Sequence, residues 1–588
     1  MPIAFGLYHV TVAITAGIFV VLAIGLNIIA GYAGQPNLGH AAFWGIGAYT
    51  QAILVTRYGL SFWEALPLAT LITAVIGGAL GTISIRLRED FLAITTIGIN
   101  FVVVSIFLYM PFFGGSLGIS GVLPPTLLGV PITKPGYLAL VGLVVAALVA
   151  LDLRLRASWL GTGWAALRED EVAAEACGVD TRRFKIAAFV VGTAIAGLAG
   201  GLYAHFIQFV EYRDFGFLSS VAVLSMVAVG GLGTLRGAIA GAILLTVLPE
   251  VFRAVSEYRM LLYGATLVLV MRYQPAGLLG AHSWLGRLID RRRAPPEAPP
   301  QVPFVPAGPG TGHAPAENVP LLEVRGVAKR FAGLWAVREI SLQVRGGEIV
   351  GIIGPNGAGK TTLFNIISGL LSADRGEVLL RGRPITGLPP STIARMGVGR
   401  TFQITRPFSG LSVLMNVVVP LGHRVYPGAW AAVGRSLTAP IQARAWALLD
   451  RVGLGSYAQV PARALPLGLQ RRLEMARALA LDPQVILLDE PLGGLTAREI
   501  EEIIVLIRAL RDEGLTLLMV EHNMRVAMQL CDRLIVMHYG EKIAEGPPEV
   551  IQRDPRVREA YLGGPGKGLS PAAAEAGQHV RMSGGQGL

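Results

Sequence analysis

The stretch GPNGAGKTT at residues 354–362 has a spacing of glycine, lysine and threonine that can hold a polyphosphate. Its glycines let backbone N–H groups curl around phosphate oxygens, and a following helix adds partial positive charge at its N-terminus. Lys360 can reach the outer phosphates, and the Thr361 hydroxyl can be offered to Mg²⁺. The residues predicted to contact the nucleotide in this loop are Gly354, Asn356, Gly357, Gly359, Lys360, Thr361 and Thr362.

Three further polar groups each follow a strand-like segment. VILLDEP ends in Asp489, predicted to hold Mg²⁺ with Thr361, and in Glu490, predicted to polarise an attacking water. TLLMVEHNM delivers His522, a candidate sensor of the terminal phosphate. GRTFQ presents Gln403, a candidate catalytic residue and metal ligand. The pattern predicts hydrolysis of a nucleoside triphosphate, with ATP and Mg²⁺ as cofactors.

The composition is too apolar for a soluble globular protein. Of the 588 residues, 53% are hydrophobic and 15% charged, and the mean hydropathy is +0.56, so membrane spans are expected. The net charge of +11 is not accompanied by a basic and aromatic array, so no nucleic-acid partner is expected. The two cysteines, Cys177 and Cys531, lack metal-ligand spacing and are expected to be inert.

Apolar runs are concentrated in residues 1–285, a predicted transmembrane domain with about nine hydrophobic segments. These segments lie near residues 10–29, 41–55, 62–85, 91–110, 137–153, 186–209, 217–231, 238–252 and 260–275. The first lacks a leader-like flank and is expected to be a retained span. The second follows the glycine-broken AGYAGQPNLGH, which indicates a broken or re-entrant helix.

Basic residues indicate the orientation of these segments. With the C-terminal part in the cytoplasm, the loops predicted inside carry Arg86, Arg88, Arg154, Arg156, Arg168, Arg182, Arg183, Lys185 and Arg236. Those predicted outside carry Arg57, Lys134, Arg213, Arg253 and Arg259. The bias agrees with the positive-inside rule. The longest inside loop, 154–185, is predicted to form one helix from Trp164 to Cys177 capped by Gly178, either a solvated connector or a docking helix.

The remaining chain divides by composition. Residues 286–320 are rich in proline and glycine and are predicted to be a linker. Residues 321–562 read as an α/β domain with a helical subdomain at about 405–480. Residues 563–588 are predicted to be a disordered tail. The predicted fold is therefore multidomain, with an all-α polytopic membrane bundle followed by an α/β P-loop ATPase domain.

The order of these motifs resembles the ATPase domain of an ABC transporter, over residues 321–562. QRRLEMARAL and YGEKIAEGPPEVIQRDPRVREAYLG are similar to the ATPase subunit of high-affinity branched-chain amino-acid importers. AGYAGQPNLGHAAFWGIGAYTQAIL and LREDEVAAEACGVDTRRFK resemble that family's permease and its coupling loop. The resemblance implies that Phe331 stacks on adenine. In the coupling loop, the residues that stand at the family's matching positions are Glu171, Ala173, Ala174 and Gly178.

By the same resemblance, LPLGLQ at 465–470 stands where the family has a signature close to Leu-Ser-Gly-Gly-Gln. The signature residues expected to face the ATP of a partner domain are Pro466, Gly468, Leu469 and Gln470. Pro466 supplies neither hydroxyl nor N–H, so the site completed by this chain is predicted to be the weaker one. PLGGLTA at 491–497 also departs from the family pattern. The SGGQG at 583–587 has no strand before it and no helix after it, and is predicted to be a decoy.

The predicted function is ATP-driven uptake of branched-chain amino acids by a fused permease and ATP-binding subunit. Urea, short amides or aromatic acids are alternative substrates, and an exporter half-transporter or a non-transporting regulator are alternative classes. Asn27, Gln51 and Asn100 are expected either to line the substrate path or to form hydrogen bonds between helices. The expected setting is the cytoplasmic (inner) membrane. The expected partners are a second permease, a second ATP-binding subunit (or a second copy) and an extracytoplasmic binding protein.

Overall fold

The computed structural model describes residues 6–84, 89–127, 129–251, 258–280, 283, 320–426 and 429–562. Within these residues, contacts divide the chain into two compact units. The first unit contains the N-terminal helices together with residues 406–466, and the second contains the rest of the C-terminal part up to Leu562. The predicted linker before Pro320, the predicted tail with its SGGQG, Arg86, Arg88 and Arg253 lie outside the described residues.

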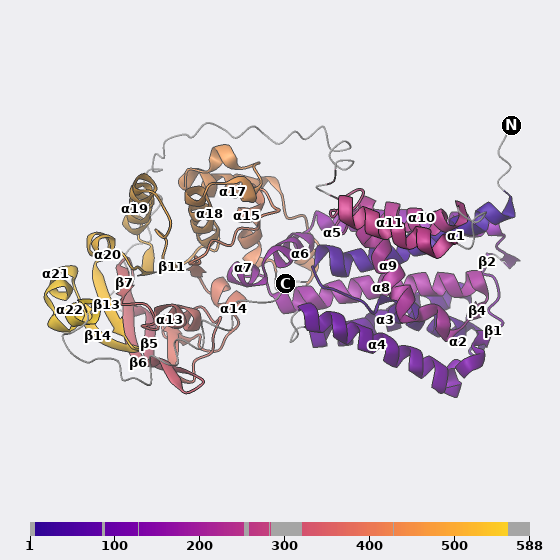
Figure 1. The fold of residues 1–588 in the computed structure, drawn as a ribbon, viewed down its shortest axis with the longest axis horizontal. Helices are drawn as coiled ribbons and strands as arrows, with labels where there is room; N and C mark the ends of the chain where they lie inside the picture. The colour runs from indigo at the N-terminus through magenta and orange to yellow at the C-terminus, as the bar shows by residue number, and fades with distance from the viewer. Residues whose placement is uncertain are drawn as a thin grey trace. The chain divides into compact units, whose positions relative to one another are not determined.

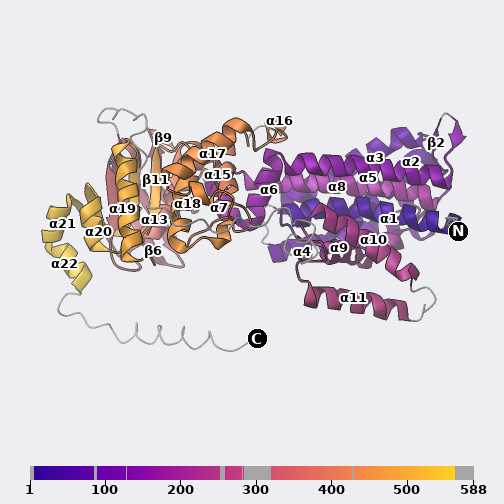
Figure 2. The same ribbon diagram turned by 90° about the horizontal axis from the view of Figure 1, so that it is seen from above.

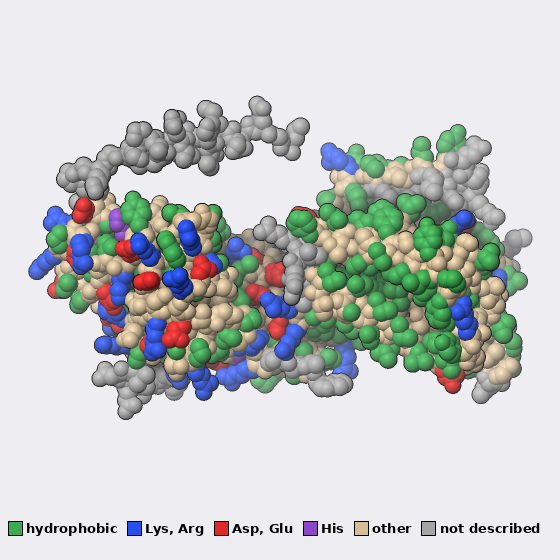
Figure 3. Space-filling view, turned by 90° about the horizontal axis from the view of Figure 1, so that it is seen from below, with side chains coloured by type: hydrophobic (Ala, Val, Ile, Leu, Met, Phe, Trp, Pro, Cys, Tyr) green, Lys and Arg blue, Asp and Glu red, His purple; other side chains and the backbone are tan. Residues whose placement is uncertain are grey.

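Every apolar stretch marked in the sequence lies in a helix, and the long helices run side by side (Figures 1 and 2). The helices are α1 (Leu7–Leu26), the π-helix η1 (Asn27–Tyr32), α2 (His40–Thr56), α3 (Phe62–Ser84), α4 (Glu89–Tyr109), α5 (Lys134–Arg156), α8 (Thr181–Ile207), α9 (Phe217–Gly230), α10 (Leu235–Val251) and α11 (Arg259–Tyr273). Five of the described helical segments are long and apolar enough to cross a membrane. On the face in Figure 3, hydrophobic side chains cover this bundle, as expected for a surface that contacts lipid.

The second helix packs deep inside the bundle against α8. At their crossing Gly47 meets Gly197 so closely that a Cβ built on Gly47 would lie 2.5 Å from the Gly197 Cα. Small residues allow this approach of two backbones, which supplies packing where no water drives association. The chain is non-helical between Tyr32 and His40, so the predicted break before α2 is present.

The polar residues in the bundle form hydrogen bonds between elements. Oδ1 of Asn27 accepts from the Gly233 N–H at 2.8 Å. Gln51 on α2 lies 2.9 Å from Nε2 of His205 on α8. Asn100 on α4 donates to the Phe215 carbonyl at 3.1 Å. Of the two expectations for these side chains, the contacts favour hydrogen bonds that fix the helices relative to one another.

The loop between α5 and α8 folds as two short helices, so the prediction of a single helix from Trp164 to Cys177 was wrong. They are α6 (Trp159–Glu169) and α7 (Glu171–Ala176). Asp170 between them is extended, with φ −161° and ψ 112°, and its side chain caps α7 by accepting from the Ala173 N–H. A capping aspartate stabilises a new helix start and so ends the previous helix. Gly178 follows α7 in the left-handed conformation, as predicted.

The C-terminal part contains two sheets. One has the order β10-β11-β12-β7-β13-β14, and the other β6-β5-β8-β9. The strands are β5 (Pro320–Phe331), β6 (Leu334–Arg345), β7 (Ile349–Ile353), β8 (Arg375–Leu380), β9 (Arg383–Pro384), β10 (Val398–Arg400), β11 (Val485–Asp489), β12 (Thr516–Val520), β13 (Arg533–His538) and β14 (Glu541–Gly546). Helices of this part include α13 (Lys360–Ile367), α15 (Val413–Leu421), α16 (Ala429–Ala432), α17 (Ala439–Arg451), α18 (Leu467–Leu479), α19 (Ala497–Asp512) and α22 (Pro555–Leu562).

The parallel order β10-β11-β12-β7 explains how distant motifs meet. The core strands β7, β11 and β12 are buried along their whole length, which suits their uninterrupted apolar sequences. Because these strands pair in parallel, their carboxyl ends share one edge of the sheet. The phosphate loop, Asp489, Glu490 and His522 follow those ends, and Gln403 follows β10. The topology therefore gathers the predicted site at the edge where open α/β sheets bind ligands.

Candidate nucleotide-binding site

The phosphate loop connects β7 to α13. Gly354 and Gly359 both have positive φ, and a Cβ on either would collide with a backbone carbonyl, of Met537 and Ala336 respectively. Only glycine fits such positions. Lys360 is buried at the start of α13, and its Nζ donates to the carbonyls of Gly354 at 2.8 Å and Pro355 at 2.9 Å. Burial lowers the pKa of Lys360, while Glu490 and Asp489 oppose the shift.

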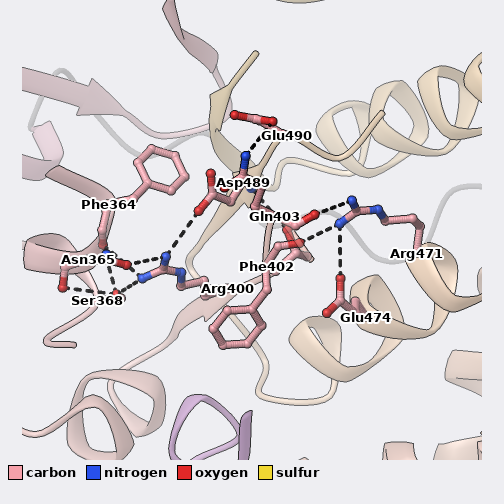
Figure 4. Close-up of polar contacts among 11 residues, drawn as sticks. Phe364, Asn365, Ser368, Arg400, Phe402, Gln403, Arg471, Glu474, Asp489 and Glu490 are labelled. Carbon is pink, nitrogen blue, oxygen red and sulfur yellow. Dashed lines mark hydrogen bonds and ion pairs between the residues drawn. The ribbon is translucent and has the colours of Figure 1, made fainter. Parts of the chain in front are cut away.

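Asp489 lies at the end of β11 beside a buried arginine that sequence analysis did not select. Arg400 donates from Nη2 to Asp489 Oδ2 at 3.3 Å and to Asn365 Oδ1 at 2.7 Å, and from Nη1 to the Ser368 hydroxyl. Figure 4 shows Arg400 between Asp489 and the residues of α13. Burial raises the pKa of Asp489, and the charge of Arg400 opposes that rise. One guanidinium thus holds the aspartate strand to the helix that follows the phosphate loop.

The donor set near Asp489 suits a hard divalent cation. Among the described residues, buried Oδ1 of Asp489 has no hydrogen-bond partner. Thr361 lies in the first turn of α13, and hydroxyl and carboxylate oxygens are the kind of ligand that Mg²⁺ prefers. The described part of the chain has no cluster of three acidic, histidine or cysteine side chains that could hold a metal. A cation here would therefore depend on phosphate oxygens for its remaining ligands.

Glu490 is held by the two other predicted catalytic residues. Its Oε1 lies 2.5 Å from Nε2 of His522, and its Oε2 accepts from Nε2 of Gln403 at 3.0 Å. Glu490 has φ 46°, a strained value for a side-chain-bearing residue. The structure thus brings Glu490, Gln403 and His522 into one hydrogen-bonded group next to the phosphate loop. Such a group can orient a carboxylate that takes a proton from water.

A second arginine missed in the sequence fixes the backbone next to Gln403. Arg471 on α18 is buried and donates to the carbonyls of Phe402 and Gln403, both at 2.5 Å (Figure 4). Arg471 therefore joins the segment that presents Gln403 to the helix that follows Pro466. The adjacent arginine pair in QRRLEMARAL was visible in the sequence, but arginines are usually solvated, so burial could not be assigned from it.

The remaining predicted residues are distributed around this centre. Phe331 ends β5 and is 47% exposed, with Nζ of Lys329 5.8 Å from the centre of its ring. Asn356 and Gly357 lie in the loop, and Thr362 follows Thr361 in α13. Pro466 precedes α18, whose first turn contains Gly468 and Leu469. Gln470 accepts a hydrogen bond from the Thr405 hydroxyl at 2.9 Å, so its side chain is tied to its own domain.

The signature segment has an acidic neighbour that the sequence did not reveal. Gly468 lies against the Glu499 carboxylate, because a Cβ on Gly468 would lie 2.9 Å from Cδ of Glu499. The other Glu499 oxygen caps α19 through the Thr496 N–H and hydroxyl, at 2.9 and 2.7 Å. A carboxylate of the same chain therefore lies against the segment that is expected to face a phosphate.

Comparisons with known proteins cover both halves of the chain. Residues 8–271 match the model for the branched-chain amino acid transport system permease component. Residues 337–493 match the ABC transporter model, and residues 541–567 the branched-chain amino acid ATP-binding cassette transporter model. The ATP-binding protein LivG of Salmonella typhimurium strain LT2, described as a high-affinity branched-chain amino acid transport protein, is 42% identical over 42% of this chain and 98% of its own. The chain belongs to the branched-chain amino acid ABC transporter family.

The permease half has its own relative. The high-affinity branched-chain amino acid permease protein LivM of Escherichia coli K12 is 38% identical over 46% of this chain and 69% of its own. A solved nucleotide-free ATP-binding cassette is 30% identical over 42% of this chain, with a TM-score of 0.38. This ABC transporter chain is thus a multi-pass membrane permease joined to a nucleotide-binding ATPase, and it couples ATP hydrolysis to transport.

The coupling loop of this ABC transporter contacts residues 406–466 through side chains other than those predicted. Asp170 accepts from Arg406 Nη1 at 3.0 Å, and Glu169 accepts from the Gly410 N–H at 2.9 Å. The matched residues serve the loop itself, since Glu171 pairs with Lys185 at 2.7 Å and both Ala173 and Ala174 are buried. Glu169 and Asp170 lie within the stretch that resembles the family, just before the four matched residues, but nothing in the sequence distinguished them from a solvated helix end.

Proposed function

We propose that this chain takes up branched-chain amino acids as the fused permease and ATP-binding subunit of an importer. The observation that carries the proposal is the joining, in one chain, of halves similar to LivM and LivG. Both relatives are described as components of high-affinity branched-chain amino acid transport. The proposed setting is the cytoplasmic (inner) membrane, with the ATPase domain on the cytoplasmic side, which agrees with the excess of basic residues in the loops on that side.

The proposed nucleotide is ATP, bound by residues of β5, of the phosphate loop with α13, of the segment after β10 and of β11. Phe331 stacks on the adenine, and Lys360 with the N–H groups of Gly357 and Gly359 binds the phosphates. Gln403, Thr361 and Asp489 would hold Mg²⁺, which would neutralise charge that develops on the transferred phosphoryl group. The partnerless Asp489 Oδ1 fits this assignment.

Hydrolysis depends on the group around Glu490. Its carboxylate accepts the proton of the attacking water, which converts water into the stronger nucleophile. Gln403 and His522 keep the carboxylate directed toward the phosphates, because each already contacts one of its oxygens. The imidazole of His522 is 40% exposed beside Glu490 and is the proposed contact to the terminal phosphate.

The working assembly contains two ATPase domains, each completing the other's site. A second permease and a second ATP-binding subunit are the proposed partners, with an extracytoplasmic protein that delivers the substrate. The altered signature supports a different partner over a second copy, since a partner with an intact signature would complete the site on this chain's phosphate loop. One active site and one weak site are the result.

Uptake into vesicles tests the proposal. The complex is reconstituted into vesicles together with its binding protein. Its ATPase domains face the vesicle lumen, where ATP is enclosed, and labelled leucine is supplied outside. ATP-dependent accumulation is expected, and Glu490→Gln should abolish it. Accumulation of urea, a short amide or an aromatic acid instead of leucine, isoleucine or valine would reassign the substrate. ATP-dependent expulsion of preloaded leucine would contradict uptake.

A further inference from the structure

The guanidinium of Arg400 joins the two elements that carry proposed cation ligands. Its Nη2 donates to Asn365 Oδ1 on α13 at 2.7 Å and to Asp489 Oδ2 at the end of β11 at 3.3 Å. Its Nη1 donates to the Ser368 hydroxyl and to the Phe364 carbonyl. The side chains of Arg400 and Asp489 are 4% and 2% exposed, so little water competes for these hydrogen bonds.

The side chains that Arg400 contacts on α13 belong to the same polar row as Thr361. Thr361, Asn365 and Ser368 follow one another at intervals of four and three residues. Because an α-helix returns to the same side after three to four residues, these side chains share one side of α13. Arg400 therefore fixes Asp489 relative to the side of the helix that carries the Thr361 hydroxyl (Figure 4).

The two carboxylate oxygens of Asp489 differ in what they contact. Oδ2 accepts from Arg400, whereas buried Oδ1 has no hydrogen-bond partner within the part of the chain that the structure describes. The backbone of Asp489 is held as well, since its N–H donates to Thr401 Oγ1 at 3.3 Å. One oxygen is thus open to a cation, and a cation that needs both oxygens must compete with Arg400.

Divalent cations differ in what they require of a carboxylate. Mg²⁺ takes a near-octahedral set of ligands at short distances, and one oxygen of a carboxylate can serve as one of them. Ca²⁺ is larger, accepts a more variable set of oxygens and often binds a carboxylate through both of its oxygens. A single open oxygen on a firmly held strand end therefore suits Mg²⁺ and disfavours Ca²⁺.

We propose that Arg400 determines which divalent cation the ATP site accepts, because it keeps Asp489 a one-oxygen ligand at a fixed position relative to Thr361. Arg400 is a positioning residue in this role, since it acts through Asp489. The proposal rests on the proposed function only where that function makes Asp489 and Thr361 cation ligands, and it does not depend on which substrate is carried.

The test measures cation binding rather than turnover. The purified full-length chain, with a bound non-hydrolysable ATP analogue, is loaded with Mn²⁺, which electron paramagnetic resonance detects, and Mg²⁺ or Ca²⁺ then displaces it. The ratio of the half-displacing concentrations of Ca²⁺ and Mg²⁺ reports the selectivity. In Arg400→Met this ratio should fall by about tenfold or more, the usual effect of removing a group that orients a metal ligand. An unchanged ratio would overturn the proposal.

Two further variants separate positioning from loss of the fold. Asn365→Ala keeps the pair of Arg400 and Asp489 but removes one tie to α13, so the ratio should fall in the same direction by a smaller factor. Arg533→Met is the matched control, because Arg533 is an ion-paired arginine at the opposite, amino end of β13, and it should keep the normal ratio. Binding of the analogue in the presence of EDTA shows that each variant is folded. An equal fall in Arg533→Met would assign the effect to stability and overturn the proposal.

Asp489→Asn shows which assignment fails if the result is negative. Weaker Mn²⁺ binding in this variant, with a normal ratio in Arg400→Met and Asn365→Ala, would overturn the role of Arg400 alone. Unaltered Mn²⁺ binding in Asp489→Asn would overturn the proposed cation ligand as well. The uptake of leucine is measured separately, so neither outcome is confused with a failure of the proposed transport.

Discussion

Glu490 and His522 lie 2.5 Å apart at the ends of neighbouring parallel strands, although 32 residues separate them in the chain. The contact places an imidazole against the carboxylate proposed to take the proton from water. Glu490→Gln keeps the shape and both neighbours but removes the basic oxygen. We expect the rate of phosphate release to fall by about 10²-fold or more, the usual contribution of a general base.

Nucleotide affinity should be retained in this variant, because Lys360 and the loop N–H groups are unchanged. Glu541→Gln, which alters an exposed carboxylate paired with Arg338, serves as the control and should keep full activity. Phosphate release by the Glu490→Gln variant at more than a tenth of the normal rate would remove this residue from the mechanism.

Arg400 is expected to matter for stability as well as for the site. Arg400→Met leaves Asp489 buried without its partner and Asn365 and Ser368 without a donor. Removing one member of a buried pair costs about 3–5 kcal/mol. Denaturant unfolding of the ATPase transition measures the loss. Arg400→Met with Asp489→Asn should lose less than the sum of the two single changes, and strict additivity would contradict a direct pairing.

The ion pair between Asp170 and Arg406 should be exchangeable. Asp170→Arg or Arg406→Asp brings like charges together, so transport per ATP hydrolysed should fall in each single variant. The double variant restores opposite charges and should recover most transport. Arg183→Asp, a charge reversal elsewhere on the same loop, is the control. Failure of the double variant to exceed both single variants would show that the pair is not part of coupling.

Glu499 is expected to weaken the ATP site that this chain completes for its partner. Its carboxylate lies against Gly468 of the signature segment, so its negative charge opposes a phosphate bound there. Glu499→Gln should raise turnover at that site by about tenfold or less, since partly exposed charges contribute about 1 kcal/mol. The measurement uses a complex in which this chain carries Glu490→Gln and the partner keeps its own catalytic glutamate. The turnover measured is then that of the site which this chain completes for its partner. Glu501→Gln, exposed on the same helix, should have no effect. Equal rates for both variants would exclude this role of Glu499.

Glu175 gives the coupling loop a pH dependence. Burial raises the pKa of its carboxyl, against the hydrogen bond from the Thr181 hydroxyl at 2.7 Å. A raised pKa means that the folded chain binds the proton more tightly than the unfolded chain, so stability falls as the pH rises through that pKa. Glu175→Gln keeps an acceptor for Thr181. It should melt at a higher temperature than the unaltered chain at neutral pH, and the difference should shrink as the pH falls into the usual glutamate range. A difference that does not vary with pH would rule out the charge as its cause.

Local pattern was enough to place most elements. Apolar stretches became helices because a segment of this composition must satisfy its backbone internally in a membrane. The predicted catalytic residues lie together because they follow short apolar strands, and parallel strands bring their ends together. Asp170 was missed because one extended residue leaves little trace in helical periodicity. Arg400, Arg471 and Glu499 were missed because their partners are fixed only by tertiary packing. The hydrogen bond between Thr162 and Ser436 joins residues 274 positions apart, which puts it beyond any local pattern.

The extended backbone at Asp170 divides the coupling loop into two arms. One arm, α6, continues into α5, and the other, α7, continues into α8, which packs on α1, α2 and α3. A displacement of the bend between the arms is therefore delivered to two membrane helices at once, along two directions. A single straight helix from Trp164 to Cys177 would pass on the same displacement as one rigid rod. The loop therefore consists of two helices that meet at a bend at one residue, Asp170.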